Sequence, residues 1–294
     1  MSDAQLNDGL TAMRDQLRRL AICLKSLNIL DDASSIFGVL DTLKDLKPKK
    51  GVLSWNYSLL KSQLKLESLH VRWPGSPSAF ICIFDITIGG KIYSSPSSGS
   101  TLTKVSKKGV PKTQQNPVKK IWAEYLHPDD NSCWAIDSLA VDLQLIAHSA
   151  GASQWQQFWH FDRHITSGTQ TTDDQPLEIH PLFHFHFGGD GLANGRANNS
   201  AEWGSLLELY APRIAHPPLD LVLLIDFILS NFAGRTWKNL VDNHQEYQEI
   251  VEAAQRRFWC PYKRTLNDFF VAPNPQRKNH SARDLWPSLA HVAN

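Results

Sequence analysis

Two short stretches of this 294-residue chain alternate aromatic and imidazole side chains, and this two-residue period constrains the fold more than any other feature. The stretches read WQQFWHFDRHI at 155–165 and LFHFHF at 182–187. Because side chains on a β-strand alternate between its two faces, each stretch predicts a strand with an aromatic face and an imidazole face. If even-numbered residues of the two strands stand opposite each other, the aromatic rings meet in the core and the imidazoles gather on the other side.

The polar residues that this pairing would gather belong to the types that bind transition metals. Neutral imidazole and carboxylate are ligands of zinc, iron and manganese, and a metal with an open position makes its bound water acidic enough for hydrolysis. The sequence therefore predicts a site for one divalent transition metal and an enzyme of the hydrolase type. The candidate metal ligands are His160, Asp162, His164, His184 and His186, with His180 and Asp190 at the ends of the group.

Two other roles for these histidines remain open. They can form a polar sheet face in contact with solvent, or they can act in acid–base catalysis or phosphate binding without a metal. The chain has no GxSxG nucleophile elbow and no GxxxxGK[ST] phosphate loop, so the sequence predicts neither a serine triad nor a nucleotide cofactor.

The N-terminal segment repeats apolar residues every 3.5 positions from Leu6 to Leu27, which predicts a helix with one leucine-rich face. A second helix is predicted at residues 31–46, so that residues 1–50 form a helical hairpin. The hairpin can close on itself, or its leucine face can bind a second copy of the chain or another protein in a non-catalytic assembly. The residues of this candidate docking face are Leu10, Met13, Leu17, Leu20 and Leu24.

Residues 51–294 predict an α+β domain. Residues 79–93 are rich in β-branched and aromatic types, and Gly89-Gly90 stands where a hairpin turn would lie. Apolar residues alternate again at 139–145. Farther on, LDLVLLIDFILSNF at 219–232 predicts a buried helix followed by Gly234, and a second helix is predicted from Trp237 to Trp259, ended by Pro261.

These elements together predict the fold class. We expect an α+β fold with an N-terminal helical hairpin, a central antiparallel sheet of about five or six strands, and C-terminal helices packed on the sheet. Asp226 interrupts the buried helix at 219–232, and an unpaired carboxylate there would be costly. Arg213 is the candidate partner for Asp226 or for Asp220.

A basic segment at about 94–120 is rich in Ser, Gly, Pro and Lys and predicts a flexible loop. It can be a solvated loop, or it can contact phosphates in a nucleic-acid-associated accessory factor. The candidate nucleic-acid contacts are Lys104, Lys107, Lys108, Lys112, Lys119 and Lys120, with Arg256, Arg257, Lys263 and Arg264 as further cations.

Composition and terminal pattern indicate the cellular location and the partners to expect. The net charge is +1, so no overall field attracts nucleic acid or a membrane surface. The four cysteines form no CxxC pair, the N-terminus lacks the pattern of a signal peptide, and the longest apolar stretch is too short to span a bilayer. We therefore expect a cytoplasmic protein without a membrane partner.

Overall fold

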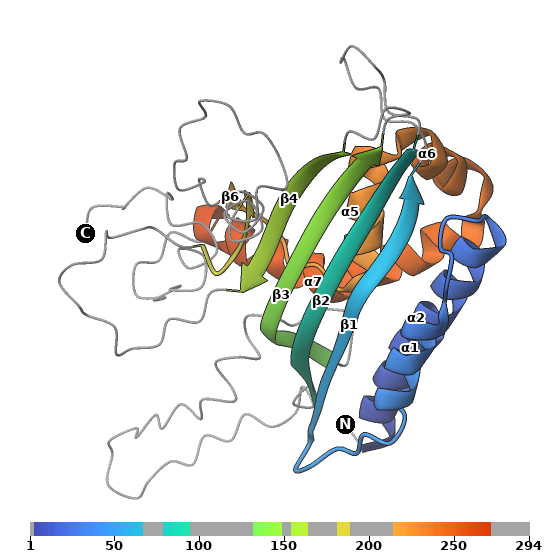
Figure 1. Cartoon of the computed structure of the whole chain (residues 1–294). Coiled ribbons are helices and arrows are strands. Elements are labelled where there is room, and N and C mark those ends of the chain that lie inside the picture. Colours follow the sequence, from blue (N-terminus) through green and yellow to red (C-terminus); the bar gives the residue numbers. More distant parts are fainter. Residues whose placement is uncertain are drawn as a thin grey trace, which may run out of the picture.

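The computed structural model describes residues 3–66, 79–94, 132–148, 154–163, 181–188 and 214–271, which form an α+β fold (Figure 1). The helices in these ranges are α1 (Asp3–Ser26), α2 (Ser34–Thr42), α5 (Leu221–Phe232), α6 (Gly234–Asn243) and α7 (Gln245–Val271). The strands are β1 (Val52–Leu66), β2 (Ala79–Ser94), β3 (Ser132–His148), β4 (Gln154–Arg163), β5 (Phe183–Phe187) and β6 (Ile214–Ala215). The predicted arrangement of N-terminal helices, antiparallel sheet and C-terminal helices is confirmed.

The six strands form one antiparallel sheet in sequence order, so each strand is hydrogen-bonded to the next strand along the chain. Their two-residue alternation gives the sheet one apolar face and one polar face. The apolar face meets the helices, as the rings of Phe161 on β4 and Phe227 on α5 show, with centroids 4.9 Å apart. Figure 1 shows α5 and α7 behind the strands and α1 and α2 beside β1. The polar face therefore lies on the side of the sheet away from these helices.

The N-terminal helix α1 buries the leucine face that its sequence predicts. Leu6, Leu17, Leu20 and Leu24 are fully buried, and α1 packs against α2, β2 and α7. The predicted second helix at 31–46 is shorter in the structure, where α2 covers Ser34–Thr42. Apolar burial on this scale is the main stabilising contribution to such a helix.

Helix α5 is the most deeply buried helix among the described residues, as its apolar sequence predicts. Asp220 caps its N-terminus by accepting a hydrogen bond from the N–H of Leu223 at 2.9 Å. Its 12 residues span roughly 18 Å. Within the described part of the chain, no helix combines the length and the apolarity needed to cross a membrane.

The carboxylate of Asp226 on α5 is satisfied by neutral donors. It accepts hydrogen bonds from Trp237 Nε1 at 2.8 Å and from the Tyr247 hydroxyl at 2.9 Å. Burial raises its pKa, which the two hydrogen bonds oppose. Arg213, the cation that the sequence offered as its partner, lies outside the described residues.

The prediction of a hairpin turn at Gly89-Gly90 is wrong, because β2 runs through both glycines. The register between β2 and β3 shifts at this point, which is the mark of a β-bulge. A Cβ atom on Gly90 would lie 2.1 Å from the carbonyl oxygen of Ala135 and 2.9 Å from the ring of Trp55. The glycine therefore makes room for the neighbouring backbone and for a buried indole.

The predicted helix from Trp237 to Trp259 is also wrong in its bounds. The chain breaks at His244 into α6 and α7, and α7 continues through Pro261 to Val271. Gly234 lies just beyond the end of α5, as expected, and is also the first residue of α6. A proline inside a helix costs one hydrogen bond, but Phe258 and Tyr262 on either side of it are buried in the core. This packing outweighs the local penalty.

Candidate functional site

The strand register brings the predicted histidine cluster together on the polar face of the sheet. Asp162 stands opposite His184, and His160 stands opposite His186, in the ladder between β4 and β5. Even-numbered residues therefore oppose each other, which is the register that gathers the imidazoles on one face. The aromatic residues of the same strands point the other way, toward α5. The predicted separation of imidazole and aromatic faces is confirmed.

A third strand adds a residue that the sequence analysis did not select. Asp142 on β3 stands opposite His160 on β4. The Nδ1–H of His160 donates to Asp142 Oδ1 across 2.7 Å. A signal for Asp142 was available, since it lies between the apolar positions Val141 and Leu143 and must share the polar face. Only the pairing of β3 with β4 identifies its partner.

These contacts form a continuous network across three strands, which we call the His–Asp network (Asp142, His160, Asp162 and His184). Asp162 is its centre, because each of its oxygens faces a different imidazole. Asp162 Oδ2 lies 3.4 Å from His160 Nε2, and Asp162 Oδ1 lies 3.0 Å from His184 Nε2. At the inner end, His184 Nδ1 donates to the carbonyl oxygen of Pro181 at 2.9 Å.

The network leads from the protein interior to solvent. The exposed fraction of the side chain is 1% for His184, 30% for Asp162, 24% for His160 and 73% for Asp142. A proton or a polar ligand can therefore reach His160 and Asp142 from outside. The imidazole of His184 is fixed in the interior by its contacts with Asp162 and Pro181.

The carboxylates set the charge of His160. Burial is the largest single influence and lowers its pKa, but hydrogen bonds to Asp142 and Asp162 together outweigh it and raise the pKa to about 9. The converse holds for Asp162, where burial raises the pKa but contacts with His160 and His184 hold it well below its usual range. At neutral pH the centre therefore contains an imidazolium between two carboxylates.

His186 lies beside the His–Asp network. Its ring centroid is 5.1 Å from that of His160 and 6.0 Å from that of His184, and its ring is inclined by 23° to that of His184. Three imidazoles are thus grouped at neighbouring positions of β4 and β5.

Four of the five predicted metal ligands come together in this group, namely His160, Asp162, His184 and His186. The fifth, His164, lies outside the described residues, as do His180 and Asp190. Within the described ranges, no group of three or more His, Cys, Asp or Glu side chains is arranged to hold a metal ion. The nitrogens of His160 and His184 face oxygen atoms of the protein instead.

The predicted nucleic-acid contacts fall in two parts of the chain, and only one of these parts is described. The six lysines from Lys104 to Lys120 lie outside the described residues. Of the other cations, Arg256 contacts Glu252, and Lys263 lies over the ring of Trp259. Arg257 is buried, and its Nη1 lies 3.6 Å from Oδ2 of the buried Asp220. Its guanidinium therefore pairs with the N-cap residue of α5 and does not face solvent.

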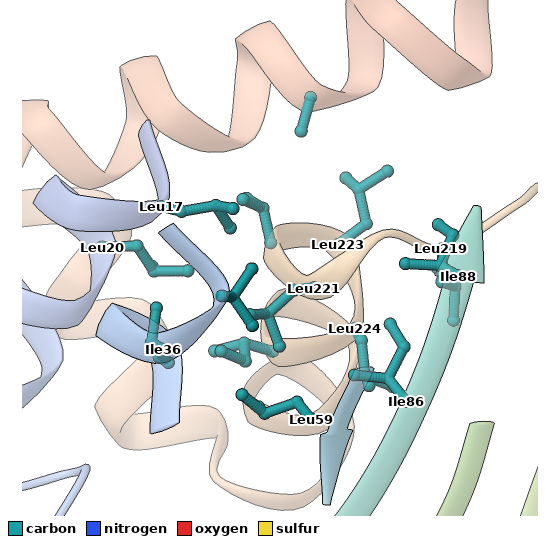
Figure 2. Packing of buried hydrophobic residues seen from close by; sticks show 14 of the residues in the cluster. Leu17, Leu20, Ile36, Leu59, Ile86, Ile88, Leu219, Leu221, Leu223 and Leu224 are labelled. Carbon is teal, nitrogen blue, oxygen red and sulfur yellow. The ribbon is translucent and has the colours of Figure 1, made fainter. Parts of the chain in front are cut away.

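The candidate docking face of α1 is occupied by the chain's own core. Leu10, Met13, Leu17, Leu20 and Leu24 are each at most 4% exposed. Figure 2 shows Leu17 and Leu20 directed toward Leu221 and Leu223 of α5, with Ile36 of α2 close by. The leucine repeat therefore reflects intramolecular packing against α2 and α5.

Comparison of the chain with protein-family models, with curated proteins and with solved structures found no match.

Proposed function

We propose that the protein is an enzyme of the hydrolase type and that the His–Asp network with His186 is its catalytic centre. The observation that carries this proposal is the position of His160 between Asp142 and Asp162. The two carboxylates keep its imidazole protonated at neutral pH, and its side chain still reaches solvent. The Nδ1 proton of His160 lies against the exposed carboxylate of Asp142, so a leaving group that takes the place of this carboxylate can receive the proton.

His186 is suited to the complementary role of base. Its ring centroid lies 5.1 Å from that of His160, so the two imidazoles can face one bound substrate together. In the proposed reaction, His186 accepts a proton from water, the water oxygen attacks the substrate, and His160 protonates the departing oxygen or nitrogen. Asp142 and Asp162 act as positioning residues, because they orient and charge His160.

Hydrolysis of esters with a poor leaving group tests this proposal. The substrates are phenyl acetate, phenyl phosphate and diphenyl phosphate, whose phenolate oxygen needs a proton to depart, and the variants are His160→Gln and His186→Gln. We expect each variant to lose about 100-fold or more in kcat. The rate of the native protein should fall as the pH rises through about 9, where His160 loses its proton.

His244→Gln is the matched control, since His244 lies between α6 and α7, in a different element from the network. It should keep the native rate and pH profile. Equal rates in the native protein, in His160→Gln and in His186→Gln would contradict the proposal. A loss of rate without a change in pH profile on removing Asp142 would indicate a structural role only.

A metal-dependent form of the same centre is the second candidate. The supporting observation is the opposed placement of four side chains of metal-ligating types on β4 and β5. His160, Asp162, His184 and His186 would hold one zinc, iron or manganese ion, and the ion would activate water as a nucleophile. Because a metal binds deprotonated imidazole, it would displace the hydrogen-bonded protons, and its affinity would rise with pH.

Titration with Co²⁺ separates the two candidates. A d–d absorption band with a stoichiometry of one ion per chain, lost in the His184→Ala/His186→Ala double variant, would support the metal-dependent form. Metal analysis of untagged protein by mass spectrometry should then show a matching loss. Absence of the band, together with ester hydrolysis that survives treatment with a chelator, would favour proton transfer by the histidines alone.

A further inference from the structure

A cavity of about 410 Å³ lies at the opposite edge of the sheet from the His–Asp network. It is formed by the turn after α1, by the end of β1 and by the first turns of α6. The network belongs to β3, β4 and β5, whereas β1 is the first strand in the sheet order. The volume falls within the range of small-molecule sites, which is about 300 to 1,000 Å³.

The lining of this cavity is divided between apolar and polar side chains. Leu66 and Leu240 are buried beneath it, and Leu27 is partly buried beside them. Lys65 and Arg235 are exposed cations at its rim. A ligand that fills the cavity would therefore contact the partly buried Leu27 and the guanidinium of Arg235, whereas Lys65 is already paired with Asp31.

Three polar side chains of the lining, Lys65, Arg235 and Asn239, offer hydrogen-bond donors. Among the residues that the structure describes, Arg235 makes no ion pair, while Lys65 contacts the carboxylate of Asp31. The side-chain oxygen of Asn239 accepts a hydrogen bond from Asn243 at 2.7 Å, which leaves its NH₂ group as the available donor. Donors with a net positive charge recognise anions, and the planar guanidinium suits carboxylate and phosphate groups.

We propose that this cavity binds a small organic anion, a carboxylate or phosphate group carried on an apolar body. The apolar body lies against Leu27, the partly buried leucine of the lining, and the anionic group contacts Arg235 and the NH₂ of Asn239. The site is independent of the proposed hydrolase centre, because the two share no residue and lie on different strands.

Isothermal titration calorimetry of the full chain tests this inference with four probes. Hexanoate and hexyl phosphate carry both features of the proposed ligand, hexanol carries only the apolar body, and inorganic phosphate carries only the charge. We expect both hexyl anions to bind at least about tenfold more tightly than hexanol and inorganic phosphate. Added salt should weaken the binding of the anions, because Arg235 is exposed.

Arg235→Gln should weaken the binding of both hexyl anions by about tenfold or more, whereas hexanol should be unaffected. Lys238→Gln is the matched control, since Lys238 lies on the same helix and pairs with Asp242 outside the cavity. Both substitutions are at exposed positions, and thermal unfolding followed by circular dichroism checks that both variants remain folded.

Three results would overturn the inference. The first is failure of both hexyl anions to bind at about 10 mM, a concentration above the dissociation constant of even a weak specific site. The second is binding of hexanol as tight as that of hexanoate. The third is equal affinity in the native protein and in Arg235→Gln. None of these results bears on the hydrolase centre, whose variants are different.

Discussion

Asp162 stands directly across from His184 in the ladder between β4 and β5, and its Oδ1 atom lies 3.0 Å from His184 Nε2. The other oxygen of the same carboxylate faces Nε2 of His160 at 3.4 Å. One carboxylate therefore joins a buried imidazole to an imidazole that reaches solvent. The geometry and the charge of the network both depend on this residue.

Replacement of Asp162 by Asn should lower the pKa of His160 from about 9 toward its ordinary value of 6.5. The amide keeps the size of the side chain but removes the negative charge that both imidazoles face. We expect the free energy of unfolding to fall by about 1–3 kcal/mol, because His184 is left buried beside a weaker partner. Titration of the imidazole Cε1–H signals by NMR and urea unfolding measure the two effects.

Asp142→Asn is the comparison for this variant. Asp142 also raises the pKa of His160, but its side chain is 73% exposed. Its replacement should lower that pKa while changing the free energy of unfolding by less than about 1 kcal/mol. An unchanged His160 pKa in Asp162→Asn would show that the contact at 3.4 Å carries no charge coupling.

Stability should depend on pH through His160. Because its pKa is raised from 6.5 to about 9 on folding, the folded chain holds a proton that the unfolded chain releases in this interval. The contribution is fully present below pH 6.5 and is lost as the pH rises through about 9. It amounts to about 2 kcal/mol, since each pKa unit corresponds to about 1.4 kcal/mol and solvent weakens the pairing.

Urea unfolding at a series of pH values measures this dependence. The variant His160→Gln cannot bind the proton, so its free energy of unfolding should change less between these limits. If the native protein and the variant show the same slope, the pH dependence belongs to other groups.

Gly90→Ala should destabilise the protein by about 2 kcal/mol or more, as overpacking of a filled core does. The added Cβ would lie 2.1 Å from a backbone oxygen that cannot move without disturbing β3. Gly38→Ala is the control, because a Cβ on Gly38 in α2 meets no atom within 4 Å. In a helix this change should raise stability by about 0.5–1 kcal/mol. Thermal unfolding of both variants measures these two changes in stability.

Leu20→Ala tests the interpretation of the leucine repeat. Leu20 is fully buried in the core, so the substitution should cost about 2–5 kcal/mol at every protein concentration. Ile22→Ala on the same helix should change stability by less than about 0.5 kcal/mol, because Ile22 is 55% exposed. Analytical ultracentrifugation accompanies the unfolding measurements. If Leu20→Ala instead abolishes self-association and leaves the stability of the monomer unchanged, the leucine face of α1 binds a second copy of the chain.

The separation of histidines from aromatic rings on β4 and β5 followed from the sequence alone. In any extended chain, successive side chains point to opposite faces. The position of a residue in the sequence therefore decides which other residues share its face. The same holds for the leucine face of α1, whose period matches the helix. The fold class and four of the candidate site residues could be predicted for this reason.

Tertiary structure decided where these faces lie and what they meet. Asp142 joins the network only because β3 pairs with β4, and Gly90 lies in a bulge, not a turn, because Trp55 and Ala135 approach it. The leucines of α1 pack against α5, which is about 200 residues away in the sequence. Such contacts depend on the energy of packing between distant segments, and this energy overrides local preference where the two disagree, as it does at Pro261 inside α7.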